Sequence, residues 1–280
     1  MEFLTLNNGI QIPQLGIGTY RLNDPDISEQ AVLEALRDGY RLVDTAEIYH
    51  NERYIGSALR ECGLPRESLF VTTKIWPAHY RGDRPRRALE HSLKRLGSDY
   101  VDLLLLHQYF GDWKNAWKQL ERMQEEGLAR SIGVCNFYTV RSIAEFDSFA
   151  HVAPAVDQVE CHPLIQHGAL QHYLEGVGIR LMAWYPLGHG NTLLLEQPVL
   201  MELSRQYRKS VPQIILRWHI QKGHIVIPKS TNPRHIKADI NVFNFTLTEE
   251  EMKMIDGLNM GRSLLRRWEH LEKIKYCILR

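Results

Sequence analysis

Three consecutive apolar runs in the first 110 residues each end in an ionisable side chain. Asp44 ends the first run, Lys74 the second and His107 the third. Tyr49 follows on the loop after Asp44. A buried carboxylate or ammonium group is costly unless it is paired. Packing alone therefore does not explain an acid, a base and a phenol at these places. A role in catalysis would explain them.

The chemistry that these residue types permit is proton transfer to a carbonyl oxygen. A tyrosine is a poor acid near neutrality because its ordinary pKa is about 10. A neighbouring ammonium such as Lys74 is expected to lower the pKa of Tyr49, provided that Asp44 holds the ammonium in place. His107 can donate or accept a hydrogen bond at the substrate oxygen. Such a phenol can protonate a carbonyl oxygen while a cofactor delivers hydride to the carbon.

Strands and helices alternate regularly along the chain, and this rhythm would bring those residues together. Strand-like segments are expected at 15–18, 42–44, 69–74, 101–107, 131–135, 155–160, 180–184 and 225–228. Helices are expected at 28–37, 53–60, 85–96, 113–126, 139–149, 170–175, 198–208, 211–221, 233–239 and 248–258. Ser28 is the expected N-cap of the first helix. This order predicts an α/β fold, a parallel (β/α)8 TIM barrel, as a single domain over residues 1–280.

Both ends of the chain lie outside the eightfold pattern. Residues 5–12 alternate around Asn8-Gly9, which predicts a β-hairpin that could cap the bottom of the barrel. The tail Met260–Arg280 is rich in arginine and lysine. It is expected either to fold over the barrel mouth as a substrate loop or to remain a surface tail.

Composition excludes several classes of protein. The formal net charge is +1, so no overall field points to nucleic acid or membrane as a partner. The first residues lack a basic and apolar leader, and no apolar run approaches the length of a membrane span. Four widely spaced cysteines are expected to be reduced thiols. We expect a cytoplasmic protein that is a monomer or a weak dimer.

Active sites of such barrels lie at the carboxyl ends of the strands, where further polar residues occur in this chain. These strand-end residues are Cys135, Asn136, Glu160, Trp184, Lys229 and Ser230. A single polar strand end is usually a solvated loop residue. Several that face one mouth predict a site.

Two other patterns favour structure over function. Cys161-His162 with His167 and His172 fits no common zinc spacing, so we expect these side chains to point apart and predict no metal. The basic segment 84–95 is expected to be the outer face of a barrel helix.

The motifs together resemble those of the aldo-keto reductase family, along almost the whole chain. They are Asp44-Thr-Ala-x-x-Tyr49-x-Asn-Glu52, Lys74-Ile-Trp76, Leu105-Leu-His107, Ile132-Gly-Val-Cys-Asn-Phe137, Asp157-Gln-Val-Glu-x-His-Pro163 and Ile227-Pro-Lys-Ser230. The resemblance implies a barrel and NAD(P)H-dependent reduction of a small-molecule carbonyl substrate. It implies a catalytic tetrad of Asp44, Tyr49, Lys74 and His107.

The same resemblance implies a set of contacts to the cofactor. Asn136 and Gln158 would hold the nicotinamide amide, with Cys135 where the family usually has serine, and Trp184 would stack on the ring. Lys229 and Ser230 would meet the 2′-phosphate of NADPH. The remaining implied cofactor contacts are Gly18, Thr19, Asp44, Leu187, Arg234, His235 and Asp239.

The sequence departs from the family at the phosphate end. His235 stands where arginine is common, Arg234 comes one residue early, and Asp239 replaces a frequent asparagine. One residue on a helix is a turn of about 100°, so Arg234 is expected to point elsewhere. We therefore predict NADPH as cofactor with a modest preference, and NADH as possible.

Loops that are long in many relatives are short here, after His107 and after Leu187. The substrate pocket is therefore expected to be open and shallow. Its predicted lining residues are Tyr20, Trp76, His107, Tyr109 and Trp113.

Two other functions are kept as alternatives. One is a non-catalytic NADP(H)-binding regulatory barrel or redox sensor, which an assay of NADPH oxidation would separate from an enzyme. The other is a zinc hydrolase built on Cys161, His162 and His167, which metal analysis would test.

Overall fold

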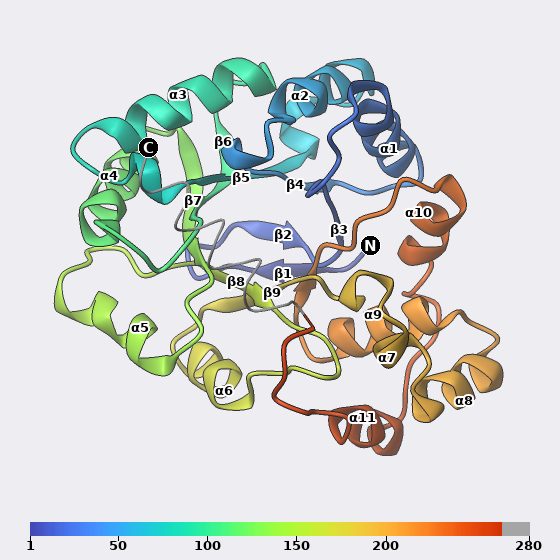
Figure 1. Ribbon diagram of the computed structural model, residues 1–280. Coiled ribbons are helices and arrows are strands. Elements are labelled where there is room, and N and C mark those ends of the chain that lie inside the picture. The colour runs from blue at the N-terminus through green and yellow to red at the C-terminus, as the bar shows by residue number, and fades with distance from the viewer. Residues whose placement is uncertain (265–280) are drawn as a thin grey trace.

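The computed structural model describes residues 1–264, and eight parallel strands form its central barrel (Figure 1). The strands, in spatial order, are β3 (Gly16–Gly18), β4 (Leu42–Asp44), β5 (Phe70–Ile75), β6 (Val101–Leu106), β7 (Ala129–Cys135), β8 (Val156–Glu160), β9 (Arg180–Trp184) and β10 (Ile225–Val226). A parallel bridge between Leu15 and Val226 joins the two edges of the sheet. The predicted parallel barrel is confirmed.

Helices after the strands surround the barrel, as Figure 1 shows in a view along its axis. They are α1 (Pro25–Arg37), α2 (Glu52–Glu61), α3 (Arg84–Leu96), α4 (Trp113–Glu125), α5 (Val140–Ala144), α6 (Gly168–Gly176), α7 (Thr192–Leu195), α8 (Pro198–Tyr207), α9 (Val211–Gln221), α10 (Pro233–Ile240) and α11 (Glu249–Asp256). In the part of the chain that the structure describes, no helix is long and apolar enough to cross a membrane.

Several elements differ from the sequence expectation. Helix α1 begins before Ser28, because the Asp24 side chain accepts a hydrogen bond from the Ile27 amide at 2.9 Å and Pro25 occupies the first helical position. The helix expected at 139–149 ends at Ala144 and continues as a 3-10 turn. Strand β10 is only two residues long, and α7 was not anticipated.

The N-terminal hairpin pairs β1 (Phe3–Thr5) with β2 (Gln11–Pro13). Its turn closes through Gly9, whose φ of +84° is a conformation that glycine adopts without strain. Leu6 and Ile12 pack into the core inside the barrel. The hairpin therefore closes the end of the barrel opposite the carboxyl ends of the strands, as predicted.

The alternation of side chains along a strand places the ionisable residues inside the barrel. Leu42, Phe70 and Leu105 all belong to the inner core. Asp44 lies two residues beyond Leu42 and, by the same alternation, shares its face. Lys74 lies four residues beyond Phe70, and His107 lies two beyond Leu105. All three therefore point inward above the apolar core, at the mouth.

The beginning of the predicted tail is fastened to the mouth. The Ser263 hydroxyl donates to a Glu160 carboxylate oxygen at 2.6 Å, and the Leu264 amide donates to the other oxygen at 3.2 Å. The Met260 amide donates to the Leu164 carbonyl at 3.0 Å. The prediction of a substrate loop concerns mainly residues 265–280, which lie outside the described residues.

Candidate active site

A buried ion pair lies at the bottom of the barrel mouth. The Lys74 ammonium is 2.5 Å from one Asp44 carboxylate oxygen, and it also donates to the Thr45 carbonyl at 2.9 Å. Both charged side chains are at most 3% exposed. Burial raises the pKa of Asp44, while Lys74 and Gln158 oppose that change. The charges are thus paired and hydrogen-bonded, as burial requires.

Tyr49 is held above this pair by the two residues that end its motif. The Asn51 side chain accepts from the Thr45 hydroxyl at 2.9 Å and donates to the Thr19 carbonyl at 2.8 Å. Glu52 is fully buried and accepts from the Thr73 hydroxyl at 2.6 Å. The loop is therefore tied to three strand ends at once, which fixes the position of the phenol.

The Tyr49 phenol lies 3.4 Å from the Lys74 ammonium, but the pKa shift is opposite to the one expected from the sequence. Burial is the main cause of the raised pKa of Tyr49, which lies well above its ordinary value, and the nearby Asp44 carboxylate adds to it. Tyr49 is therefore protonated at neutral pH, as a tyrosine with an ordinary pKa would also be.

His107 faces the same space as Tyr49. Their ring centroids are 5.7 Å apart, and the Trp76 ring packs edge-on against His107 at 5.0 Å. The Tyr20 ring packs against Tyr49 at 5.1 Å, and this residue is 44% exposed. The structure therefore brings together all four residues predicted to be catalytic, below an aromatic rim.

Asn136 connects two strand ends at the mouth. Its amide nitrogen donates to the His107 carbonyl at 2.9 Å. Its amide oxygen accepts from the Trp184 indole at 3.0 Å and from the Tyr138 hydroxyl at 2.8 Å. The backbone of Asn136 has a φ of +66°, an uncommon conformation that asparagine tolerates better than most residues. These bonds hold the Trp184 ring at the edge of the mouth.

Gln158 connects the ion pair to the opposite side of the barrel. Its amide nitrogen donates to the second Asp44 oxygen at 2.7 Å, and its oxygen is 3.6 Å from the Cys135 sulfur. Burial raises the pKa of the Cys135 thiol well above its ordinary value. Cys135 is therefore a neutral contact here.

A single cleft of about 1300 Å³ extends from Tyr49 and His107 to α10. Its wall includes every residue predicted to contact the cofactor except Arg234. The predicted residues in the wall are Gly18, Thr19, Asp44, Cys135, Asn136, Gln158, Trp184, Leu187, Lys229, Ser230, His235 and Asp239. Arg234 is exposed and lies outside this wall, so the cofactor contact predicted at Arg234 is corrected, and the reason is its helical phase one residue before His235.

The far end of the cleft lies on the loop before α10. Lys229 and His235 are exposed, and Asn232 caps the helix by accepting from the Arg234 amide at 2.9 Å. Burial raises the pKa of Asp239 to about 7. This end therefore presents the Lys229 ammonium, a helix N-terminus and a carboxyl group that titrates near neutrality.

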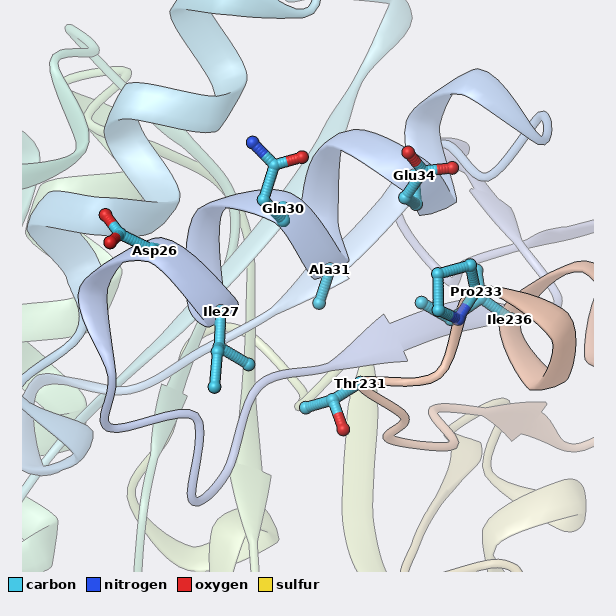
Figure 2. A pocket seen from close by; sticks show the side chains of 8 residues that line it. All are labelled: Asp26, Ile27, Gln30, Ala31, Glu34, Thr231, Pro233 and Ile236. Atoms are coloured by element: carbon cyan, nitrogen blue, oxygen red, sulfur yellow. The ribbon is translucent and has the colours of Figure 1, made fainter.

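A second hollow, of about 220 Å³, lies on the other side of this loop between α1 and α10. Figure 2 shows the residues that line it: Asp26, Ile27, Gln30, Ala31, Glu34, Thr231, Pro233 and Ile236. Thr231 lines both this hollow and the main cleft. The loop that carries Lys229 is therefore a thin wall with open space on both sides.

Two of the predicted substrate contacts are corrected. Tyr109 is 41% exposed, and its hydroxyl donates to Glu145 at 2.5 Å on the outside of the cleft. Trp113 is buried among aromatic rings, including Phe146 at 5.1 Å. Neither residue belongs to the cleft wall. The reason is that the chain after His107 turns outward at once into α4.

Sequence reasoning missed three wall residues from other loops. Arg21 lies 3.4 Å from the His189 imidazole, so the loops after β3 and β9 meet across the cleft. His189 stacks on the Tyr185 ring at 5.4 Å. Leu264 closes the wall from the C-terminal segment. No motif marks these residues in the sequence.

The side chains of Cys161, His162 and His167 point apart. His162 contacts Glu160 at 3.3 Å and His167 contacts the Glu160 carbonyl at 2.8 Å, whereas Cys161 lies in a cluster of potential metal ligands with His219 and His224. The basic segment forms α3, where Arg95 pairs with Glu52 at 2.7 Å and so supports the Tyr49 loop.

Comparison with known proteins gives a consistent result. The model of the Aldo/keto reductase family matches residues 14–260. The chain is 42% identical over 264 residues to a 9,11-endoperoxide prostaglandin H2 reductase of Trypanosoma cruzi (strain CL Brener), covering 93% of each protein. It is 40% identical over 259 residues to a glyoxal reductase of Bacillus subtilis (strain 168), covering 92% of this chain and 93% of the relative.

Solved structures give the same answer for the fold. An aldo-keto reductase of Bombyx mori, solved in complex with NADP, superposes with a TM-score of 0.91 at 34% identity. The superposition covers 97% of each chain.

Proposed function

The chain belongs to the aldo/keto reductase family and is an oxidoreductase, and from this premise we propose that it reduces aldehydes and ketones to alcohols with NADPH. Tyr49 is the proposed proton donor. The observation that carries this proposal is the position of the Tyr49 phenol, 3.4 Å from a Lys74 ammonium that is itself paired with Asp44. A protein that only bound the cofactor would gain nothing from a costly buried ion pair at this place.

The shape and charge of the cleft fit a phosphorylated dinucleotide. Its volume of about 1300 Å³ exceeds the roughly 300–1,000 Å³ of an ordinary small-molecule pocket. Lys229 and Ser230 at the far end supply a cation and a hydroxyl for a phosphate group. We assign Asn136, Gln158 and Trp184 to the nicotinamide end. When bound, the cofactor supplies hydride to the carbonyl carbon.

The protein's own residues handle the proton. The raised pKa of Tyr49 keeps the phenol protonated until the carbonyl oxygen gains negative charge. His107 offers a second hydrogen bond to that oxygen and so orients the carbonyl. Lys74 stabilises the phenolate that remains after transfer, and Asp44 holds Lys74 in place. Trp76 and Tyr20 form the apolar rim that the substrate passes.

Small aldehydes are the proposed substrates. Trp76 and His107 pack at 5.0 Å on one side of Tyr49, and Tyr20 packs on the other. The aromatic rim surrounds one polar centre, formed by Tyr49 and His107. It offers few other hydrogen-bonding groups that could select one substrate over another. The glyoxal reductase among the relatives acts on a small dicarbonyl by its name, which makes glyoxal a reasonable first substrate.

The test is steady-state oxidation of NADPH by the purified protein with glyoxal and an aromatic aldehyde. Turnover with formation of the alcohol is expected, and parallel reactions with NADH should be slower. Binding of NADPH without turnover on any carbonyl of a broad panel would instead support a regulatory barrel or redox sensor.

A further inference from the structure

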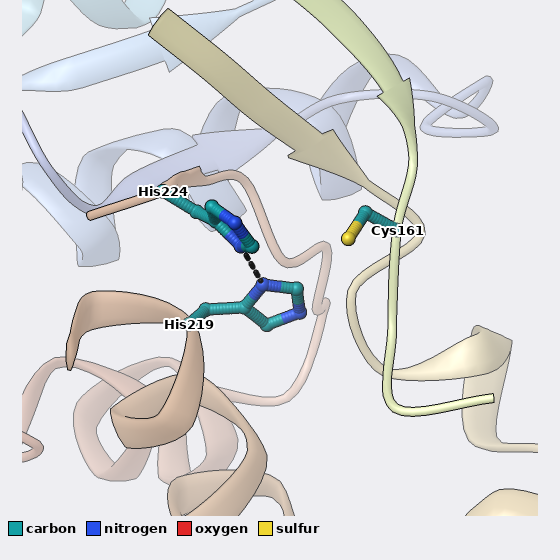
Figure 3. Close-up of side chains that lie close together, drawn as sticks. All are labelled: Cys161, His219 and His224. Carbon is teal, nitrogen blue, oxygen red and sulfur yellow. Dashed lines mark hydrogen bonds between the residues drawn. The ribbon is translucent and has the colours of Figure 1, made fainter. Parts of the chain in front are cut away.

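Behind the barrel mouth, three potential metal ligands meet in the protein interior. Cys161 follows β8, His219 lies on α9, and His224 precedes β10. One ligand atom from each lies within 4.8 Å of the others. Figure 3 shows the Cys161 sulfur directed toward the two imidazole rings, which are tilted by 55° against each other. Each of the three residues is at most 1% exposed, and none belongs to the wall of the main cleft.

The hydrogen bonding of this cluster is incomplete as it stands. The Nδ1 atoms of His219 and His224 are 3.0 Å apart, so one ring must donate and the other accept. Nε2 of each ring is buried without a hydrogen-bond partner among residues 1–264. Burial lowers the pKa of His219 well below its ordinary value, and the nearby Pro186 carbonyl opposes that change, so Nε2 of His224 is the clearer of the two unpaired atoms. A buried polar atom without a partner costs about 1–3 kcal/mol, so the pair is a poor choice for packing alone.

We propose that Cys161, His219 and His224 form a binding site for one thiophilic metal ion. Two imidazoles and one thiolate are the ligand set that such ions select. Nitrogen ligands on one ion are about 3.3–3.5 Å apart, given metal–nitrogen bonds of about 2.0 Å. The observed separation of 3.0 Å is within a small adjustment of that value.

The charge balance favours Cu(I) over Zn²⁺. A thiolate and two neutral imidazoles neutralise Cu(I) completely, whereas they leave a net charge of +1 on Zn²⁺. A net charge in a closed interior is costly. After burial, which dominates the pKa of each ligand, the Lys222 ammonium also lowers the pKa of all three, so it would repel a positive complex. A neutral complex avoids this repulsion.

Binding involves no redox step. Burial raises the pKa of the Cys161 thiol to about 12 and lowers that of His224 to about 3. Each neutral imidazole has one nitrogen with a free lone pair, and in the ring that donates in the Nδ1–Nδ1 hydrogen bond the proton must move to Nε2 before Nδ1 can bind the ion. The ion replaces the thiol proton, a copper–sulfur bond forms, and one proton leaves for each ion bound.

The site is closed, so loading is best done while the chain folds. The protein is produced in copper-supplemented and in zinc-supplemented medium, desalted against a chelator under reducing conditions, and its metal content measured. We expect close to one equivalent of copper per chain, in the reduced state, and at least tenfold less zinc. X-ray absorption of the copper protein should show one sulfur and two imidazole nitrogens.

Matched variants locate the ion. Cys161→Ser and His224→Gln should each lose at least tenfold of the retained copper, whereas Cys62→Ser and Cys277→Ser should keep it. The proposed site would be overturned if the wild-type protein retained no copper, or if its X-ray absorption spectrum showed no sulfur ligand. Both results are independent of whether the variants fold. Copper retention unchanged by Cys161→Ser would overturn it as well. Equal retention of zinc and copper would overturn the argument from charge.

Discussion

The two ends of the main cleft are built in opposite ways. At the reacting end, Asp44 and Lys74 are almost fully buried and lie 2.5 Å apart. At the phosphate end, Lys229 and His235 are exposed, and neither takes part in an ion pair within the described residues. One end rests on strands inside the barrel, and the other on a loop with a hollow on each side.

This difference suggests that the reaction and the choice of cofactor depend on different ends of the cleft. A strand inside a packed barrel fixes its side chains to a fraction of an ångström, which proton transfer requires. A loop fixed on fewer sides can exchange one cation for another without disturbing the barrel. We therefore expect substitutions at the reacting end to remove activity or stability, and substitutions at the phosphate end only to shift the choice of cofactor.

The largest effect is expected from Tyr49→Phe. This change removes the proposed donor and keeps the ring that packs on Tyr20 and His107. The value of kcat should fall by at least about 10²–10⁴-fold, as is usual for loss of a general acid. NADPH affinity, measured by fluorescence quenching, should remain within a few fold. Retention of most activity would show that another group supplies the proton.

Lys74→Met should affect both turnover and stability. It leaves the Asp44 carboxylate buried without its partner, at a cost of about 3–5 kcal/mol. Urea unfolding measures that cost, and steady-state kinetics the loss of turnover. Asp44→Asn should reduce turnover less, because the Lys74 ammonium beside Tyr49 remains. The double variant should recover much of the stability but none of the activity, and a double variant as unstable as Lys74→Met would contradict the pairing.

At the phosphate end, Lys229→Ala should weaken NADPH binding by about tenfold, which corresponds to one exposed charge-assisted hydrogen bond. NADH binding should not change. Arg234→Ala is the matched control, because Arg234 is a neighbouring cation outside the cleft wall. The ratio of the two cofactor dissociation constants is the measurement.

His235→Arg should strengthen NADPH binding relative to NADH binding, which is the opposite of the change expected for Lys229→Ala. A guanidinium offers a bidentate fork that an imidazole lacks, and His235 belongs to the cleft wall. A contrary result would be a ratio of the NADPH and NADH dissociation constants that changes in Arg234→Ala but in neither Lys229→Ala nor His235→Arg. That result would mean that the phosphate is held elsewhere.

The smallest effect concerns Asp239, whose pKa burial raises to about 7. Between pH 6 and pH 8 this carboxyl group ionises beside the proposed phosphate site, so NADPH affinity should fall a few fold over that range. Asp239→Asn should abolish this pH dependence. An equal pH dependence in the asparagine variant would exclude Asp239 as its cause.

The ionisation of Asp239 can also be tested through the stability of the protein. The folded state holds the Asp239 proton up to about pH 7, whereas an unfolded aspartate releases it near pH 4. The free energy of unfolding should therefore decrease as pH rises from about 4 to 7. The asparagine variant should be the more stable protein at pH 8.

The sequence by itself determined the barrel and the reacting end. Strand alternation puts Asp44, Lys74 and His107 on the inner face, and parallel strands bring their carboxyl ends to one mouth. The phase of a helix already indicated that Arg234 and His235 face different directions, although Arg234 was kept among the predicted cofactor contacts. These are properties of local periodicity, which a sequence displays directly.

Only the tertiary structure decided which groups oppose each other across elements. The pKa of Tyr49 is raised mainly because the phenol is buried, and next because Asp44 lies nearby, and both follow from how the strands and loops pack. Cys161 was grouped with His162 in the sequence, yet the chain turns it toward His219 and His224 instead. Neighbouring residues on an extended chain point to opposite sides, so a cluster of ligands is assembled by folding, from segments about 60 residues apart.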